Sequence, residues 1–166
     1  MTHIFDQPSY GASVMAEQRL NAAILRANIR EGFEEYLDIL DCFYAEDIEA
    51  SSEGSEGIVI GKASLRSRIA AFLTSLHVLA EIGGLVASIH VEPIRSDARD
   101  ETHSQWTLEL NGATGRRCVL VWRSCRRWRK GCVVYERHYD IEQTGGPLTM
   151  DDLCMLPQAR GSELVQ

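Results

Sequence analysis

The stretch WRKGCVVYERHYD, from Trp128 to Asp140, decides the fold because it is a candidate β-hairpin turning at Lys130 and Gly131. Side chains alternate between the two faces of a strand. After the turn, one face would carry Val133, Tyr135, Arg137 and Tyr139, and the other Val134, Glu136, His138 and Asp140. Both sets include groups able to do chemistry, so the face that lines a cavity decides the function.

Period-two patterns continue upstream of this hairpin. The strands predicted from alternation and from the turns between them are residues 85–95, 102–111, 117–129 and 132–141. Short polar or glycine-bearing connections favour antiparallel pairing of neighbouring strands. This half of the chain therefore predicts one long antiparallel sheet.

The first half of the chain has helical periodicity instead. Helices are predicted over residues 13–30, 33–47 and 61–77, and two short extended pieces around a Gly/Ser/Glu turn lie between the last two. Helices followed by strands indicate an α+β domain with three helices laid on one face of the sheet. We expect a tail at residues 1–12, one domain at 13–142, and a tail at 143–166 with a short helix in TMDDLCML.

The hairpin register divides the strands into two faces. If Arg129 opposes Cys132, one face collects the polar set Arg123, Cys125, Glu136, His138 and Asp140, joined by His103, Gln105 and Thr107. The other face collects the aromatic set Trp106, Trp122, Trp128, Tyr135 and Tyr139. Hydrophobicity alone favours the aromatic face as the core, which would leave His138 and Glu136 at the surface. Alternatively, the aromatic face meets a second subunit and the polar face lines a cavity.

Bulk composition narrows the function classes. The chain has 166 residues, 45% of them hydrophobic, and a net charge of −7. The acidic balance argues against nucleic-acid binding by the arginine-rich segment RRWRK, and no membrane span or signal peptide is expected. The five cysteines form no CxxC pair and are expected to be reduced, with no metal site. We expect a cytoplasmic protein.

Three motifs in order resemble the nuclear transport factor 2-like superfamily, particularly its SnoaL-like branch: CFYAEDIEASS, GIVIGKASL and WRKGCVVYERHYD. The resemblance implies a cone-shaped fold, in which three helices pack in the concave face of a curved antiparallel sheet and a pocket opens between helices and sheet. It also implies a homodimer through the outer sheet face, here Trp106, Trp122, Tyr135 and Tyr139. In this branch a catalytic Asp lies on the last strand, and His138 stands at that position, so the resemblance implies that the Glu136, His138 and Asp140 face is inward.

Two departures separate the sequence from characterised activities of that superfamily. Gln105 and Thr107 stand where epoxide hydrolases carry an Arg and an Asp, and Ser52 stands where steroid isomerases carry a general-base Asp. Neither catalytic set is complete. The fold also hosts noncatalytic binders, so the resemblance leaves the reaction open.

The candidate site is a pocket with His138 as acid or base and Glu136 as its neighbour. The residues expected to contact a ligand are Tyr44, Asp47, His103, Gln105, Arg123 and Asp140. One hypothesis is a cofactor-independent lyase, isomerase or cyclase acting on a hydrophobic metabolite with a carbonyl or hydroxyl group. The alternative is a noncatalytic ligand-binding or dimeric interaction domain of the same fold. Neither hypothesis implies a metal or an organic cofactor.

Overall fold

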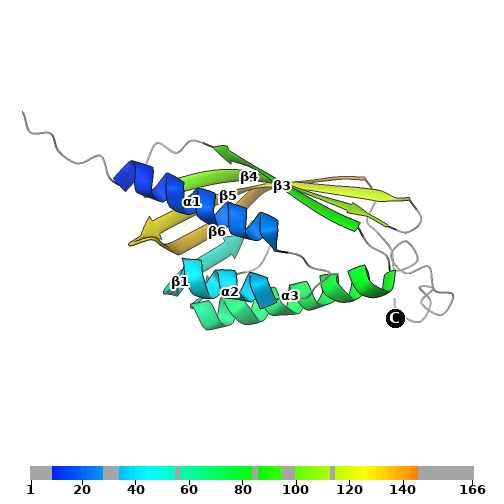
Figure 1. The fold of residues 1–166 in the computed structure, drawn as a ribbon, viewed down its shortest axis with the longest axis horizontal. Helices are drawn as coiled ribbons and strands as arrows, with labels where there is room; N and C mark the ends of the chain where they lie inside the picture. Colours follow the sequence, from blue (N-terminus) through cyan, green and yellow to red (C-terminus); the bar gives the residue numbers. More distant parts are fainter. Residues whose placement is uncertain are drawn as a thin grey trace, which may run out of the picture.

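The structure, a computed structural model, describes residues 9–27, 34–54, 57–83, 86–94, 100–112 and 115–145. Its elements in chain order are α1 (Ser9–Arg26), α2 (Glu34–Phe43), β1 (Tyr44–Ser52), β2 (Val59–Ile60), α3 (Lys62–Gly83), β3 (Val86–Ile94), β4 (Glu101–Asn111), β5 (Arg117–Arg129) and β6 (Cys132–Thr144). The predicted α+β class is confirmed, with all helices laid against one face of a bent sheet (Figure 1).

The strands form one six-stranded sheet in the order β2-β1-β6-β5-β4-β3. Strands β3 to β6 are joined as antiparallel neighbours, as their short connections predicted. Strand β1 pairs in parallel with β6, and β2 pairs antiparallel with β1. The sheet is therefore mixed, because β1 comes from the helical half of the chain.

Helix α1 packs against β3 and β4 and reaches β5 through Glu17, while α2 and α3 lie beside β1 (Figure 1). The apolar core forms where these helices meet β1, β5 and β6. Its buried members are Leu20, Leu37, Leu40, Tyr44, Ile48, Ala50, Leu65, Trp128 and Val133. These side chains fill the space between the helices and one half of the sheet face. A cavity can therefore lie only beneath the other half.

Helix boundaries differ from the predicted ones by a few residues. Helix α1 begins at Ser9 rather than at residue 13, and α2 ends at Phe43, so that Tyr44 and Asp47 belong to β1. The predicted helix in TMDDLCML lies outside the described residues. In the part of the chain that the structure describes, no helix is long and apolar enough to cross a membrane.

A β-bulge after the hairpin corrects the predicted faces. Arg129 opposes Cys132 as expected, but the register shifts between Arg127 and Trp128, whose partners are Tyr135 and Val133. Val134 is the extra residue, so the alternation of β6 slips by one relative to β5. Ser124 rather than Arg123 therefore opposes His138, and Arg126 rather than Cys125 opposes Glu136.

The bulge turns the tryptophans inward together with Glu136 and His138. Trp106 is 2% exposed and stacks on Trp122, whose ring meets that of His138 edge-on. The expectation that Trp106 and Trp122 form a subunit interface is therefore wrong. On the outer face the expected Tyr135 and Tyr139 remain.

Candidate functional site

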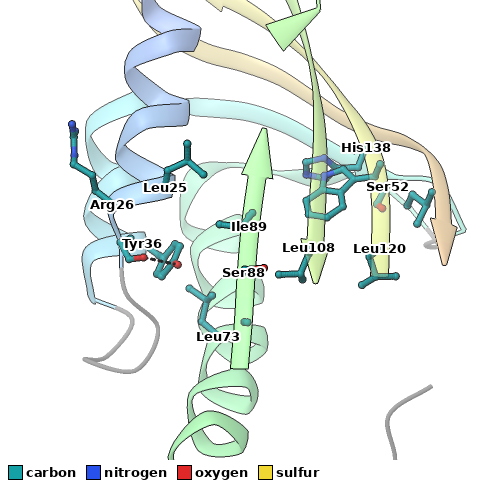
Figure 2. A pocket seen from close by; sticks show the side chains of 14 residues that line it. Leu25, Arg26, Tyr36, Ser52, Leu73, Ser88, Ile89, Leu108, Leu120 and His138 are labelled. Carbon is teal, nitrogen blue, oxygen red and sulfur yellow. Dashed lines mark hydrogen bonds between the residues drawn. The ribbon is translucent and has the colours of Figure 1, made fainter. Parts of the chain in front are cut away.

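A cavity of about 820 Å³ opens between the helices and the sheet, in the half of the concave face that the apolar core leaves unfilled (Figure 2). Its wall is mostly apolar. The lining residues are Leu25, Arg26, Ala27, Tyr36, Ser52, Leu73, Ala87, Ser88, Ile89, Leu108, Leu120, Trp122, His138 and Ile141. Every helix and five of the six strands contribute a side chain. Only a few polar atoms interrupt the apolar wall, which is typical of small-molecule sites.

His138 is the titratable side chain that the sheet contributes to the wall. It is held on both ring nitrogens: Ser124 Oγ lies 2.9 Å from Nδ1, and Glu136 Oε1 lies 3.3 Å from Nε2. An ionised carboxylate only accepts hydrogen bonds, so Nε2 carries a proton, and in the neutral ring Nδ1 accepts from the Ser124 hydroxyl. Of the His138 side chain, 32% is exposed. Ser124 and Glu136 therefore fix the orientation of the His138 ring in the cavity wall.

Behind His138 lies a buried ion network centred on Arg126. Its Nε donates to Glu136 Oε2 and its Nη1 donates to Glu17 Oε1, each at 2.6 Å. All three charged side chains are buried. Buried charges are tolerated when they are paired and hydrogen-bonded, and here one guanidinium joins a carboxylate from α1 to a carboxylate from β6.

Neutral groups donate further hydrogen bonds to the two carboxylates. The Tyr44 hydroxyl donates to Glu136 Oε2 at 2.6 Å. Ser104 and Thr102 on β4 donate to Glu17 at 2.6 and 2.9 Å. The network thus reaches from α1 through β4, β5 and β6 to β1, and it fixes the carboxylate that faces His138.

The pKa values follow from this packing. Burial raises the pKa of Glu136, but the charges of Arg126 and His138 and the hydrogen bonds that it accepts outweigh burial and hold that pKa well below its usual range. Burial and the nearby Glu136 carboxylate raise the pKa of Tyr44 well above its usual range. Glu136 is therefore an anion and Tyr44 a neutral hydroxyl at ordinary pH.

The predicted site residues separate into three places. His138 lines the cavity, while Glu136 and Tyr44 lie behind the wall and contact each other rather than the cavity. Asp47 is exposed on β1 and accepts two hydrogen bonds from Arg129, at 2.6 and 2.8 Å. His103 is half-buried on the outer face of the sheet. It was grouped with His138 because the bulge was not foreseen.

Gln105, Arg123 and Asp140 also lie on the outer face, in a separate polar hollow of about 490 Å³. Arg123 Nη1 pairs with Asp140 Oδ2 at 3.3 Å. Asp140 has a positive φ of 50° at a second register shift, between Val121 and Arg123, and this irregularity removes its side chain from the His138 face. The expectation that these three residues share a pocket with His138 is therefore wrong.

Sequence reasoning missed Arg126 and Glu17. Arg126 begins the arginine-rich segment RRWRK, and it alternates with Trp122, Ser124 and Trp128, whose side chains all point inward. Glu17 lies three residues before Leu20, so the two side chains share a face of α1, and both are buried. Glu17 and Arg126 are oppositely charged residues, each on an otherwise buried face. This was the signal in the sequence that they form an ion pair.

Solved structures with the same fold include functionally diverse proteins. A proposed SnoaL-like polyketide cyclase from Mesorhizobium loti has a TM-score of 0.53 at 16% identity, over 76% of this chain and 97% of that one. An LEH-like epoxide hydrolase from M. tuberculosis has a TM-score of 0.51 at 16% identity, over 88% and 89% of the two chains. A computationally designed 17-OHP binder has a TM-score of 0.52 at 16% identity, over 82% and 98%.

These likenesses establish the fold and leave the activity open, because sequence identity is low throughout. No protein-family model matches the sequence, and no curated protein is significantly similar to it. The function must therefore be argued from the cavity itself.

Proposed function

The chain has the cone fold of SnoaL-like proteins of the nuclear transport factor 2-like superfamily, and on this premise we propose that it binds a hydrophobic small molecule in the cavity beneath its helices. The cavity of about 820 Å³ carries the proposal, because ligand sites typically measure roughly 300 to 1,000 Å³ and are mostly apolar. Proteins of this fold include a designed 17-OHP binder and an LEH-like epoxide hydrolase, which supports a small organic ligand.

The lining defines the chemical class of the ligand. Leu73, Ile89, Leu108, Leu120 and Trp122 would bury an apolar body. His138 and Ser52, which oppose each other across the β1 and β6 pairing, offer a polar spot at one wall (Figure 2). A hydrophobic compound with one hydroxyl or carbonyl group fits this distribution of polar and apolar atoms.

Thermal-shift and native mass spectrometry measurements with a library of hydrophobic alcohols and ketones test the binding proposal. Ala87→Trp fills the cavity from β3, and Ala63→Trp, at an exposed position of α3 outside the lining, is the matched control. A compound that stabilises the wild type and Ala63→Trp but not Ala87→Trp supports the proposal. A compound that stabilises Ala87→Trp equally binds elsewhere and contradicts it.

A second candidate function is acid or base catalysis by His138 on the bound ligand. The supporting observation is the ring in the cavity wall with the Glu136 carboxylate behind it. Since Ser124 occupies Nδ1, a ligand must displace the Ser124 hydroxyl before this nitrogen can take a proton. Ser124 is fully buried, so it positions His138 and is unsuited to nucleophilic attack.

Two variants separate catalysis from binding. His138→Gln should keep ligand binding and abolish turnover of any compound that the wild type converts. Ser124→Ala should keep turnover, because it frees Nδ1 while Glu136 still holds Nε2. Turnover that persists in His138→Gln would exclude His138 as the catalytic group, whereas a wild type that binds a compound and returns it unchanged would be a noncatalytic binder.

A homodimer through the outer sheet face is a separate part of the proposal. With Trp106 and Trp122 turned inward, Tyr135 and Tyr139 are the aromatic residues that support it, and Arg127 lies over the Tyr135 ring at 4.9 Å. Sedimentation at micromolar concentration tests this, with Tyr135→Glu as the disrupting variant. A wild-type monomer would contradict it.

A reducing, cytoplasmic location is the remaining part. Among the described residues, Cys42, Cys118, Cys125 and Cys132 are free thiols, which supports such a compartment. Fractionation of cells that express the full chain would measure it.

A further inference from the structure

Three potential metal ligands meet on the outer face of the sheet, away from the cavity. They are Glu101 and His103 on β4 and Cys125 on β5, and one ligand atom from each lies within 4.8 Å of the other two. We propose that these three side chains bind one zinc ion. The site has no CxxC signature in the sequence, because its ligands come from two strands.

The backbone explains why the three side chains converge. His103 and Cys125 are directly opposed in the β4 and β5 pairing, and Glu101 lies two residues before His103 on the same face. Adjacent strands in regular antiparallel pairing hold these positions firmly. All three side chains are half-buried, so an ion can enter from solvent without the sheet opening.

The ligand set suits zinc. A thiolate, an imidazole nitrogen and a carboxylate oxygen are its usual ligands, and three protein ligands leave the fourth tetrahedral position to water. A thiolate and a carboxylate together would neutralise the two positive charges of the ion. With three protein ligands and one position for water, the arrangement resembles catalytic zinc sites more than structural sites with four protein ligands.

Outer contacts already orient two of the ligands. Tyr139 Oη lies 2.9 Å from His103 Nδ1, and His103 Nε2 is the nitrogen that faces Glu101 Oε1, also at 2.9 Å. With Nδ1–H donating to Tyr139, Nε2 is left unprotonated for the metal, which is how metal-bound histidines are commonly held. Arg127 Nε donates to Glu101 Oε2 at 3.2 Å, which leaves Oε1 for the ion.

Two features oppose binding and set limits on affinity. Burial and the neighbouring Glu101 raise the pKa of Cys125 to about 11, so the ion must displace a thiol proton. The guanidinium of Arg127 adds a positive charge next to Glu101. We therefore expect one ion per chain, bound less tightly than in four-ligand structural zinc sites.

Cobalt titration of the reduced full-length chain tests the site, because Co²⁺ replaces zinc and reports a bound thiolate by a charge-transfer band. The wild type should show this band, saturating at one ion per chain and lost on addition of zinc. Cys125→Ser should lose the band, and Tyr139→Phe should weaken binding roughly 10- to 100-fold, as loss of an outer contact does.

Two controls exclude adventitious binding. Cys42→Ser removes an exposed thiol. His90→Ala removes an exposed histidine of β3 whose Nε2 lies 3.6 Å from Glu92 Oε1 on the same strand. Both should keep the wild-type band. A wild type without the band, or a band that survives Cys125→Ser, overturns the proposal; circular dichroism checks that each variant is folded.

Discussion

Arg126 is the residue on which the polar interior depends. It is 2% exposed and is the shared partner of Glu17 and Glu136, so neither carboxylate is left as an isolated buried charge. Removing one partner of a buried ion pair typically costs about 3 to 5 kcal/mol, because the other charge stays buried. The orientation of His138 therefore depends on a residue that never reaches the cavity.

At this scale the pH dependence of stability can be predicted for Glu136. Its pKa in the folded protein lies below the unfolded value of about 4.3, so the unfolded chain binds more protons as the pH falls. Its contribution is fully present above the unfolded value and is lost as the pH falls toward the folded one. In this window we expect the free energy of unfolding of the wild type to fall by up to about 1.4 kcal/mol per pH unit. Glu136→Gln should lack this pH dependence.

Urea unfolding of the wild type and Glu136→Gln between about pH 3 and pH 7 measures this slope. The control is Glu46→Gln, since the Glu46 side chain is 87% exposed and pairs with Lys62 at the surface. Parallel stability curves for the wild type and Glu136→Gln would show that Glu136 is not held as a buried anion.

At the scale of elements, the bulge at Val134 sets the composition of each sheet face. The sequence predicted the hairpin, its turn and the bounds of β5, because alternation and the Lys130-Gly131 pair are local signals, but β6 runs to Thr144 rather than ending at residue 141. It could not predict a single extra residue, since Val134 is an ordinary strand former and the slip shows only in the pairing with β5. Glu136 and His138 were therefore assigned to the inward face, and Arg126 was not.

The turn of this hairpin offers a prediction of its own. Lys130 and Gly131 have φ values of 51° and 78°, and the left-handed region disfavours lysine far more than asparagine or glycine. Lys130→Asn should raise the free energy of unfolding by about 0.5 to 1 kcal/mol. Urea midpoints measure the change, with Lys130→Val, which is β-branched, expected to lower stability; equal midpoints in both variants would refute the turn assignment.

At the scale of the whole molecule, the buried ion network fastens α1 across the sheet. Glu17 and Asn21 on α1 reach Arg126 and Ser104, so the helix is held by directional contacts as well as by Leu20. One wall of the cavity, at Leu25 and Arg26, belongs to this helix. Its attachment therefore determines whether the cavity is enclosed.

A double-mutant cycle between Glu17→Gln and Arg126→Met measures this attachment. We expect a coupling energy of about 1 to 3 kcal/mol, because both side chains are buried. The exposed pair of Asp47 and Arg129, tested with Asp47→Asn and Arg129→Met, has similar bond lengths and should couple by less than about 1 kcal/mol. Equal coupling energies in the two pairs would mean that burial does not strengthen the interaction between α1 and the sheet.

The distances along the chain that this network spans have a consequence for biosynthesis. The Glu17 and Arg126 contact joins residues 109 apart, and the Tyr44 and Glu136 contact joins residues 92 apart. Long-range contacts close large loops and slow folding. While the chain is being made, Glu17 remains without its cation until most of the sequence has left the ribosome. The cavity can therefore form only after the last strand has been translated, and a nascent chain has no site at which a ligand could stabilise it.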